Sequence, residues 1–288
     1  MTRPAYLSEE AIHLFIRSAL AEDIGEGDHS SLAAVPSSSQ GMGKLLIKDD
    51  GIIAGLEVAE KIFREVDPQL KVLFFKKEGD PISKGEIAFE VSGLAQSILS
   101  AERLVLNCMQ RMSGIATYTR QLCKLIEGTK TQLLDTRKTT PNFRLMEKWA
   151  VTIGGGHNHR FALYDMIMLK DNHVDMAGGI KNAIERTRQY LADKNRSLKI
   201  EIETRTLREV EEVLLTGGVD IIMLDNMNLA DIKKAVALID GKYKTEASGG
   251  ITETTLRPVA ECGVDFISVG ALTHSVKSLD LSLKTAPL

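Results

Sequence analysis

The second half of the chain repeats one pattern, a short apolar strand followed in several cases by a helical run, and this repeat limits the possible folds more than any other feature. Strands that alternate with helices form parallel sheets. Turns suited to phosphate binding come late, after EAS and FISV, which favours an α/β barrel over an open sheet. We therefore predict a barrel with its chemistry at the strand ends. The strand-type segments are TQLLDTRK, DMIMLK, KIEIETR, DIIMLDN, KTEASGG and DFISVGA.

A different pattern precedes this repeat. Ser8, with acidic residues directly after it, predicts the start of a helix that ends near Asp23. Short β-type runs alternate with turn signals from Lys44 to Gly93, which predicts a small β-rich unit. The helical pattern from Ala95 to Glu127 predicts a connector between two domains, and Ser113-Gly114 marks where a break in this helix would fall.

Composition excludes several classes of protein. The 288 residues are 43% hydrophobic and 26% charged, which suits one large or two ordinary globular domains. The net charge of -3, the single Trp and the absence of a basic stripe argue against nucleic-acid binding. No apolar run approaches the roughly 20 residues of a membrane span, and the first residues read as amphipathic rather than as a signal peptide, so we expect a cytoplasmic protein without membrane contact.

The three cysteines suggest neither a disulfide framework nor a zinc cluster. Cys108, Cys123 and Cys262 are odd in number and far apart, in apolar helical contexts. We expect buried thiols.

Cationic side chains gather between residues 136 and 170. This segment holds a Gly-Gly-Gly turn at 154–156, where the missing Cβ atoms let the backbone approach a ligand closely. Arginine forks and exposed amides bind carboxylate and phosphate oxygens well. The segment therefore predicts a site for a polyanionic ligand. Its cationic or titratable members around the turn are Arg137, Lys138, His159 and Arg160.

His157 and His159 raise the alternative of a zinc site, since alternate histidines can share a metal ion. No cysteine or acidic ligand stands near them in the sequence. We favour a structural role for His157 and a hydrogen bond from His159 to a carboxylate.

Carboxylates are expected inside the barrel. Strand alternation places Glu201 and Glu203 on one face of their strand, and Asp225 on the face of Ile221 and Met223. Interior carboxylates are costly unless a cation meets them, and Mg²⁺, a lysine or sugar hydroxyls would serve.

Lys170 follows the apolar run MIML. We favour it as the charge partner of the interior carboxylates or of a phosphate. The alternative is a Schiff-base lysine, as in barrel aldolases.

Two turns predict a phosphate site. Each closes a short apolar segment and precedes an expected helix, and late loops of α/β barrels commonly bind phosphate with backbone amides. These turns are Ser248-Gly249-Gly250 and Ser268-Val269-Gly270.

Nearly the whole chain resembles the quinolinate phosphoribosyltransferase family. The motifs that carry the resemblance are LAEDIGEGDHSS, AERLVLNCMQRMSGIAT, TRKTTP, GGGHNHR, MLKDNH, IEIET, IMLDN, EASGGI and VDFISVGALTHS. The resemblance implies the type II phosphoribosyltransferase fold, with an N-terminal α/β sandwich domain (1–115) followed by an incomplete, TIM-like α/β barrel (116–275), and with the tail 276–288 packed back on the sandwich domain. It also implies a homodimer with shared active sites, open to further assembly.

The resemblance implies a role for each candidate residue. Arg103 would reach into the site of the partner subunit. Arg137, His159 and Arg160 would hold the two carboxylates of quinolinate, next to Thr136. Lys138 and Lys170 would face a carboxylate or the pyrophosphate of phosphoribosyl pyrophosphate.

The remaining roles concern the sugar phosphate. Glu203 and Asp225 would bind the ribose hydroxyls or Mg²⁺, and with Lys138 and Lys170 they form the expected catalytic set. The choice of Glu203 over Glu201 depends on its spacing to Leu207. The two turns would hold the 5-phosphate.

The implied reaction transfers the phosphoribosyl group to quinolinate and releases pyrophosphate and CO₂, giving nicotinate mononucleotide. Three alternatives stay open at this point. A relative could act on nicotinate or another anionic ring, the barrel could house an aldolase that depends on Lys170, or the chain could bind a phosphate ligand without turnover.

Overall fold

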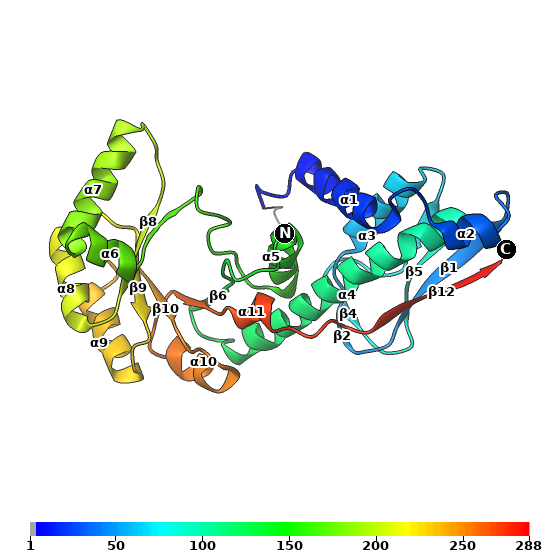
Figure 1. The fold of residues 1–288 in the computed structure, drawn as a ribbon. Coiled ribbons are helices and arrows are strands. Elements are labelled where there is room, and N and C mark those ends of the chain that lie inside the picture. The colour runs from blue at the N-terminus through cyan, green and yellow to red at the C-terminus, as the bar shows by residue number, and fades with distance from the viewer. Residues whose placement is uncertain (1–3, 288) are drawn as a thin grey trace. The chain divides into compact units, whose positions relative to one another are not determined.

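The computed structural model describes residues 4–287, which form two compact units (Figure 1). The first contains the chain up to Arg120, residues 138–155 and the chain from Ala271 onward; the second contains residues 121–137 and 156–270. Each unit therefore joins segments that are far apart in the sequence. Residues 138–155 group with the first unit, whereas the expected barrel runs from 116 to 275.

The first unit is an antiparallel sheet with helices, and its strand order is β12-β1-β5-β3. The C-terminal strand β12 pairs with β1 from Ile47↔Leu281 to Gly41↔Pro287, beside each other in Figure 1. The strands are β1 (Gln40–Ile47), β3 (Lys71–Phe74), β5 (Ile87–Leu94) and β12 (Leu281–Pro287), with the small pair β2 (Gly51–Ile52) and β4 (Pro81–Ile82). The helices are α1 (Glu9–Ile24), α2 (His29–Ala34), α3 (Leu56–Val66), α4 (Ala95–Leu125), α5 (Arg144–Gly154) and α11 (Ala271–His274).

Helix α1 confirms the prediction from Ser8, whose side chain accepts a hydrogen bond from the Ala11 amide. Helix α3, in contrast, interrupts the expected run of β-type segments. Its N-terminus is capped from a distance, because the Glu78 carboxylate accepts hydrogen bonds from the amides of Gly55 and Glu57, both at 3.0 Å. A cap supplied from another segment leaves no local signal in the sequence.

Helix α4 passes unbroken through Ser113 and Gly114. The Ser113 hydroxyl accepts a hydrogen bond from the Ala54 amide at 2.9 Å. A Cβ atom at Gly114 would lie 2.3 Å from the carbonyl oxygen of Lys277. The small polar residues thus serve close packing rather than a helix break.

A buried ion pair joins the distant segments of the first unit. Glu147 on α5 is fully buried and accepts hydrogen bonds from Arg111 of α4 at 2.8 and 2.9 Å. Arg111 also donates to the Val276 carbonyl at 2.8 Å, and the Thr140 amide donates to Glu147 at 2.9 Å. The pair of Arg111 and Glu147 therefore holds α4, α5 and the chain after α11 together.

The second unit is a parallel sheet of the order β6-β11-β10-β9-β8-β7, which confirms the predicted strands. Leu134 of β6 also forms an isolated parallel bridge with His157, which lies in the chain segment that connects β6 to β7. The strands are β6 (Gln132–Leu134), β7 (Ile167–Leu169), β8 (Ile200–Thr204), β9 (Ile221–Asp225), β10 (Lys244–Ser248) and β11 (Phe266–Ser268).

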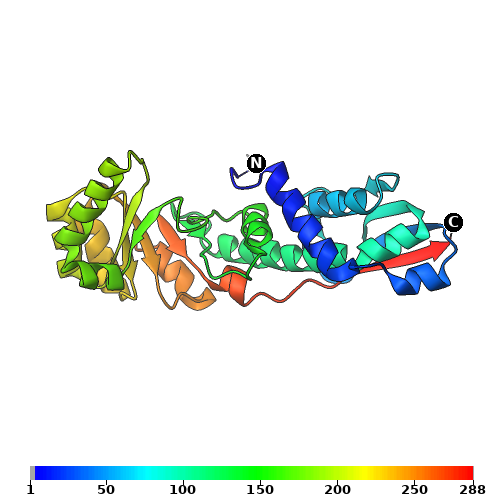
Figure 2. The same cartoon turned by 45° about the horizontal axis from the view of Figure 1, so that its top comes forward.

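Helices cover one face of this sheet (Figure 2). Thr206 and Asn228 cap α8 and α9 by accepting hydrogen bonds from the amides three residues on. The helices are α6 (Asp171–Ala177), α7 (Ile180–Asp193), α8 (Leu207–Thr216), α9 (Leu229–Ile239) and α10 (Glu253–Ala260). None of the helices within residues 4–287 has the length and apolar character of a membrane span.

The cysteines follow the prediction in part. Cys108 and Cys262 are buried, and burial raises the pKa of the Cys108 thiol to about 12. Cys123 is half-buried.

Candidate active site

The carboxyl ends of the parallel strands collect the candidate residues of the second unit. Because the strands are parallel and in register, their carboxyl ends form one edge of the sheet. The register places Glu203 opposite Met223, and Asp225 opposite Ser248. The residues at or just after these ends are Arg137 (β6), Lys170 (β7), Glu203 (β8), Asp225 (β9), Ser248 (β10) and Ser268 (β11).

Arg103 and Lys138 belong to the first unit. Arg103 is exposed on α4. Lys138 is also exposed, and its carbonyl accepts a hydrogen bond from the Thr273 hydroxyl at 2.8 Å.

Two guanidinium groups, Arg137 and Arg160, interact electrostatically. Both side chains are half-buried, and Arg160 donates to the carbonyl of Met166 at 3.1 Å. Burial and then the charge of Arg137 lower the pKa of Arg160, while Glu201 and Asp165 oppose this shift. Like charges held together in a partly buried site favour an anion between them.

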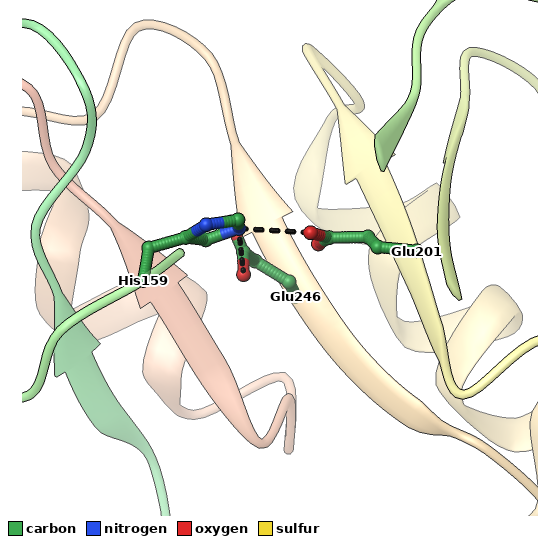
Figure 3. A group of neighbouring side chains, drawn as sticks. All are labelled: His159, Glu201 and Glu246. Atoms are coloured by element: carbon green, nitrogen blue, oxygen red, sulfur yellow. Dashed lines mark ion pairs between the residues drawn. The ribbon is translucent and has the colours of Figure 1, made fainter. Parts of the chain in front are cut away.

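His159 crosses the barrel interior to two carboxylates (Figure 3). Its Nε2 atom lies 2.8 Å from Glu201 Oε2 on β8 and 3.5 Å from Glu246 Oε2 on β10. Both glutamates are fully buried, and the His159 side chain is 7% exposed. A contact between one ring and two non-adjacent strands fits a sheet that curves around the ring, as in a barrel.

The other ring nitrogen of His159 faces its own backbone. The Arg160 amide donates to His159 Nδ1 at 2.7 Å. A nitrogen that accepts a hydrogen bond carries no proton, so the proton of the neutral ring belongs to Nε2, which faces the carboxylates.

Burial shifts both carboxyl groups toward their protonated form. Burial raises the pKa of Glu201 to about 7, against the lowering effect of a hydrogen bond with Glu246 and of the Arg160 charge. Burial and then the Glu201 charge raise the pKa of Glu246 to about 8. Glu246 is thus the protonated partner at neutral pH.

The cluster contains acidic groups that could ligate a metal ion together with His159, whereas the sequence near the two histidines shows none. His159, Glu201 and Glu246 have potential ligand atoms within 4.8 Å of one another, although these glutamates are far away in the sequence. His157 is exposed and is not part of this group; its amide donates to the Leu133 carbonyl at 2.8 Å.

Asp135 fixes the segment that carries His159, and this role of Asp135 was not predicted from the sequence. This fully buried side chain accepts hydrogen bonds from Asn158 Nδ2 at 2.6 Å and from the His159 amide at 2.9 Å. An acidic residue that directly follows an apolar strand was the available signal.

Glu203 lies among other charges near the strand ends. Burial, then Asp225 and Asp171, raise the pKa of Glu203, while Lys170 lowers it. The Lys170 amide donates to His173 Nδ1 at 2.9 Å, which gives His173 a capping role at the start of α6. Lys170 is exposed, and its charge acts on Glu203 from the end of β7.

Asn226 connects Asp225 to the first glycine turn. Its side chain donates to Asp225 Oδ2 at 2.6 Å, and its amide donates to the Ser248 carbonyl at 2.9 Å. Asn226 has a positive φ of 53°, an uncommon conformation that Asn tolerates better than most residues. A Cβ atom at Gly249 would lie 2.3 Å from Asn226 Oδ1.

The two predicted phosphate turns differ in their backbone. Gly249 and Gly250 have φ values of 91° and 61°, which only glycine adopts readily. In the second turn the Val269 amide donates to the Leu134 carbonyl at 3.0 Å and so continues the sheet. Ser268 is buried, and Gly270 is half-buried.

Comparison with known families gives two matches that together span most of the chain. Residues 28–113 match the quinolinate phosphoribosyl transferase N-terminal domain, and residues 115–284 match the corresponding C-terminal domain. A relative from Arabidopsis thaliana, named nicotinate-nucleotide pyrophosphorylase (carboxylating), chloroplastic, is 49% identical over 93% of this chain and 81% of its own length. A Bacillus subtilis (strain 168) protein, named probable nicotinate-nucleotide pyrophosphorylase (carboxylating), is 42% identical over 91% and 89%.

Solved structures share the fold. The crystal structure of NadC from Streptococcus pyogenes has a TM-score of 0.93 and 39% identity, with 100% of both chains covered. This match confirms the predicted fold of a sandwich domain and an incomplete barrel. Human nicotinic acid phosphoribosyltransferase has a TM-score of 0.60 at 15% identity, over 95% of this chain and 74% of its own, and shares the fold alone.

The crowding of Gly249 generates a prediction about stability. Gly249→Ala should destabilise the protein more than Gly241→Ala, by about 1 kcal/mol, because the new methyl group displaces Asn226 and weakens its hydrogen bond to Asp225. Gly241 is the matched control, since it also has a positive φ, of 70°, but has no atom within 4 Å of a Cβ. Urea unfolding of both variants measures the difference, and equal losses would contradict the role of Asn226.

The raised pKa of Glu246 predicts a pH dependence of stability. Because the folded carboxyl has a pKa of about 8 rather than its ordinary 4.5, the folded state binds a proton that the unfolded state releases between these values. The free energy of unfolding should therefore fall as the pH rises through this window, by at most about 1.4 kcal/mol for each pH unit. Glu246→Gln removes the titration, so urea unfolding at pH 5, 6.5 and 8 should show a smaller fall in the variant. An equal fall would contradict the raised pKa.

Proposed function

The chain belongs to the quinolinate phosphoribosyltransferase family, and we infer that this enzyme of NAD biosynthesis transfers the phosphoribosyl group of phosphoribosyl pyrophosphate to quinolinate and releases CO₂. The observation that carries the residue assignments is the position of the interacting pair Arg137 and Arg160 at the same barrel edge as Glu203 and Asp225. An aromatic dianion and a ribose could therefore meet at this edge.

We propose that Arg137 and Arg160 bind the two carboxylates of quinolinate. Their mutual repulsion is relieved when a dianion lies between them, and guanidinium groups bind carboxylates in a bidentate manner. The family resemblance adds Thr136, His159, Lys138 and, from the partner subunit, Arg103 to the residues that would bind the substrates.

Phosphoribosyl pyrophosphate would lie along the remaining strand ends. The glycine backbone of Gly249 and Gly250 suits close approach to the 5-phosphate, with Ser248 beside it. Ser268, Val269 and Gly270 would contribute as the second turn. Because the Val269 amide already donates to the Leu134 carbonyl, the first turn would make most of the phosphate contacts. Lys170 would face the pyrophosphate.

Glu203 and Asp225 fit Mg²⁺ or the ribose hydroxyls. Carboxylate oxygens are the ligands that Mg²⁺ prefers. Burial and then the charge of Asp225 raise the pKa of Glu203, and a bound cation would relieve this repulsion. When bound, Mg²⁺ would neutralise charge on the leaving pyrophosphate. A carboxylate beside the ribose would also stabilise the positive charge that develops at C1.

The proposed reaction has two steps. First, the bond between C1 of the ribose and the pyrophosphate oxygen breaks, its electrons leave with pyrophosphate, and the pyridine nitrogen bonds to C1. The ring is then positively charged, so it can hold the electron pair left at C2 when the adjacent carboxylate departs as CO₂. A proton from water completes nicotinate mononucleotide. The arginines position the carboxylates for both steps.

We propose a cytoplasmic homodimer in which Arg103 completes the site of the partner subunit. Its exposure on α4 is compatible with this. Three cysteines without a disulfide fit a reducing compartment.

The assay that tests the function incubates the protein with quinolinate, phosphoribosyl pyrophosphate and Mg²⁺. We expect equal amounts of nicotinate mononucleotide and CO₂, and little product from nicotinate, which lacks the second carboxylate that the arginine pair would bind. Product from nicotinate without CO₂ would favour a different anionic ring, and quinolinate binding without turnover would favour a binding protein.

Mixing of inactive variants tests the shared site. Arg103→Ala and Glu203→Ala should each lack activity, and their 1:1 mixture should regain about a quarter of the wild-type rate after subunit exchange, since about half of the dimers are then mixed and each of these has one of its two sites complete. The control mixture of Glu203→Ala with Asp225→Ala should stay inactive. A mixture of the first pair that stays inactive after subunit exchange would remove the claim for Arg103.

A further inference from the structure

Glu246 lies deeper in the barrel than the residues proposed to bind substrate. It faces the ring of His159, and Arg160, the next residue in the chain, is one of the two arginines proposed to bind quinolinate. We propose that Glu246 is a positioning residue that acts through the His159 ring on the backbone of Arg160, and thereby on the guanidinium group that binds quinolinate. The inference rests on the proposed function for the identity of the ligand. The contact between Glu246 and His159, and the spectroscopic test of it, do not depend on the proposed function.

The first link is the contact of the ring with both carboxylates. Glu246 is fully buried in β10, paired with Met223 on one side and Phe266 on the other. Strand pairing on both sides fixes its backbone. Its Oε2 atom lies 3.5 Å from His159 Nε2, and Glu201 Oε2 lies 2.8 Å from the same nitrogen. The two glutamates thus set where this end of the ring lies (Figure 3).

The second link runs from the ring to Arg160. His159 Nδ1 accepts the hydrogen bond of the Arg160 amide at 2.7 Å, and Arg160 then donates from its side chain to the Met166 carbonyl at 3.1 Å. The His159 amide is held in turn by Asp135 at 2.9 Å. A tilt of the ring therefore moves the Arg160 backbone, because the backbone on its other side is already fixed.

A metal ion is the competing interpretation of the same cluster. His159, Glu201 and Glu246 offer ligand atoms at suitable separations. Metal binding through Nε2 requires that nitrogen to lack a proton, and a ligating histidine normally donates from its other nitrogen. Here Nδ1 accepts a hydrogen bond, so the proton of the neutral ring is on Nε2, the nitrogen that faces the carboxylates. The geometry favours a hydrogen-bonded cluster.

The test compares Glu246→Gln with Glu246→Leu. Glutamine keeps the shape and can donate a hydrogen bond to Glu201, as a protonated Glu246 does, whereas leucine cannot. We expect Glu246→Leu to raise the KM for quinolinate on the order of 10-fold, because a buried polar contact that positions the arginine is lost, with the KM for phosphoribosyl pyrophosphate changed about twofold at most. Glu246→Gln should recover most of the quinolinate affinity.

Thr245→Val is the matched control. Thr245 is the adjacent buried residue of β10, and its hydroxyl donates to Asp265 rather than to the His159 cluster. This variant loses a buried hydrogen bond from the same strand, so it measures the effect of general destabilisation. If Thr245→Val raises the quinolinate KM as much as Glu246→Leu does, or if both substrates are affected equally, the positioning role is overturned.

Nitrogen-15 NMR of His159 provides a readout independent of activity. The wild type and Glu246→Gln should show a protonated Nε2 and an unprotonated Nδ1, and Glu246→Leu should show altered shifts at both. The opposite tautomer in the wild type overturns the proposal even if Glu246→Leu does not fold. A stoichiometric metal in the purified wild type that Glu246→Gln loses would overturn it in favour of a metal site.

The outcomes separate this proposal from the function. A wild type that forms no nicotinate mononucleotide contradicts the proposed function, and the NMR result still decides whether Glu246 sets the tautomer and position of His159. An active wild type whose quinolinate KM is unchanged in Glu246→Leu contradicts only the positioning role.

Discussion

The contact of His159 with two buried carboxylates is the interaction on which the catalytic unit depends. An uncompensated charge in a protein interior costs several kcal/mol, so Glu201 and Glu246 require a proton and a donor between them. The ring can supply this donor only if the segment after the glycine turn docks beside β6. Asp135 holds that segment by its backbone and by Asn158, and Arg160 comes into position as the next residue.

The strands of the barrel could be predicted because each is a local feature, an apolar run closed by a charged residue or glycine. Helix α3 could not, because the carboxylate that caps it lies on Glu78, beyond the helix and in a separate turn. The continuity of α4 was hidden for a similar reason. Ser113 and Gly114 look like a break in isolation, and only their contacts with Ala54 and Lys277 explain them.

The candidate site shows the same limit. Residues at strand ends, such as Arg137, Lys170 and Asp225, could be predicted since parallel strands bring their carboxyl ends to one edge. Residues that act through others could not. Glu246 and Asn226 stand in the motifs EASGGI and IMLDN, but they are defined by contacts with segments that the sequence places far away, which the motifs do not reveal.

Depth along the strands separates the two kinds of residue. In β8, β9 and β10 the inward residue at the strand end is half-buried, and the inward residue two positions earlier is buried: Glu203 follows Glu201, Asp225 follows Met223, and Ser248 follows Glu246. A ligand at the mouth reaches the outer member of each pair, while the inner member contacts only protein. This spacing explains why Glu201 and Glu203, which share one face of a strand, have different roles. Alternation alone could not distinguish them, because it gives the face of a residue and not its distance from the barrel mouth.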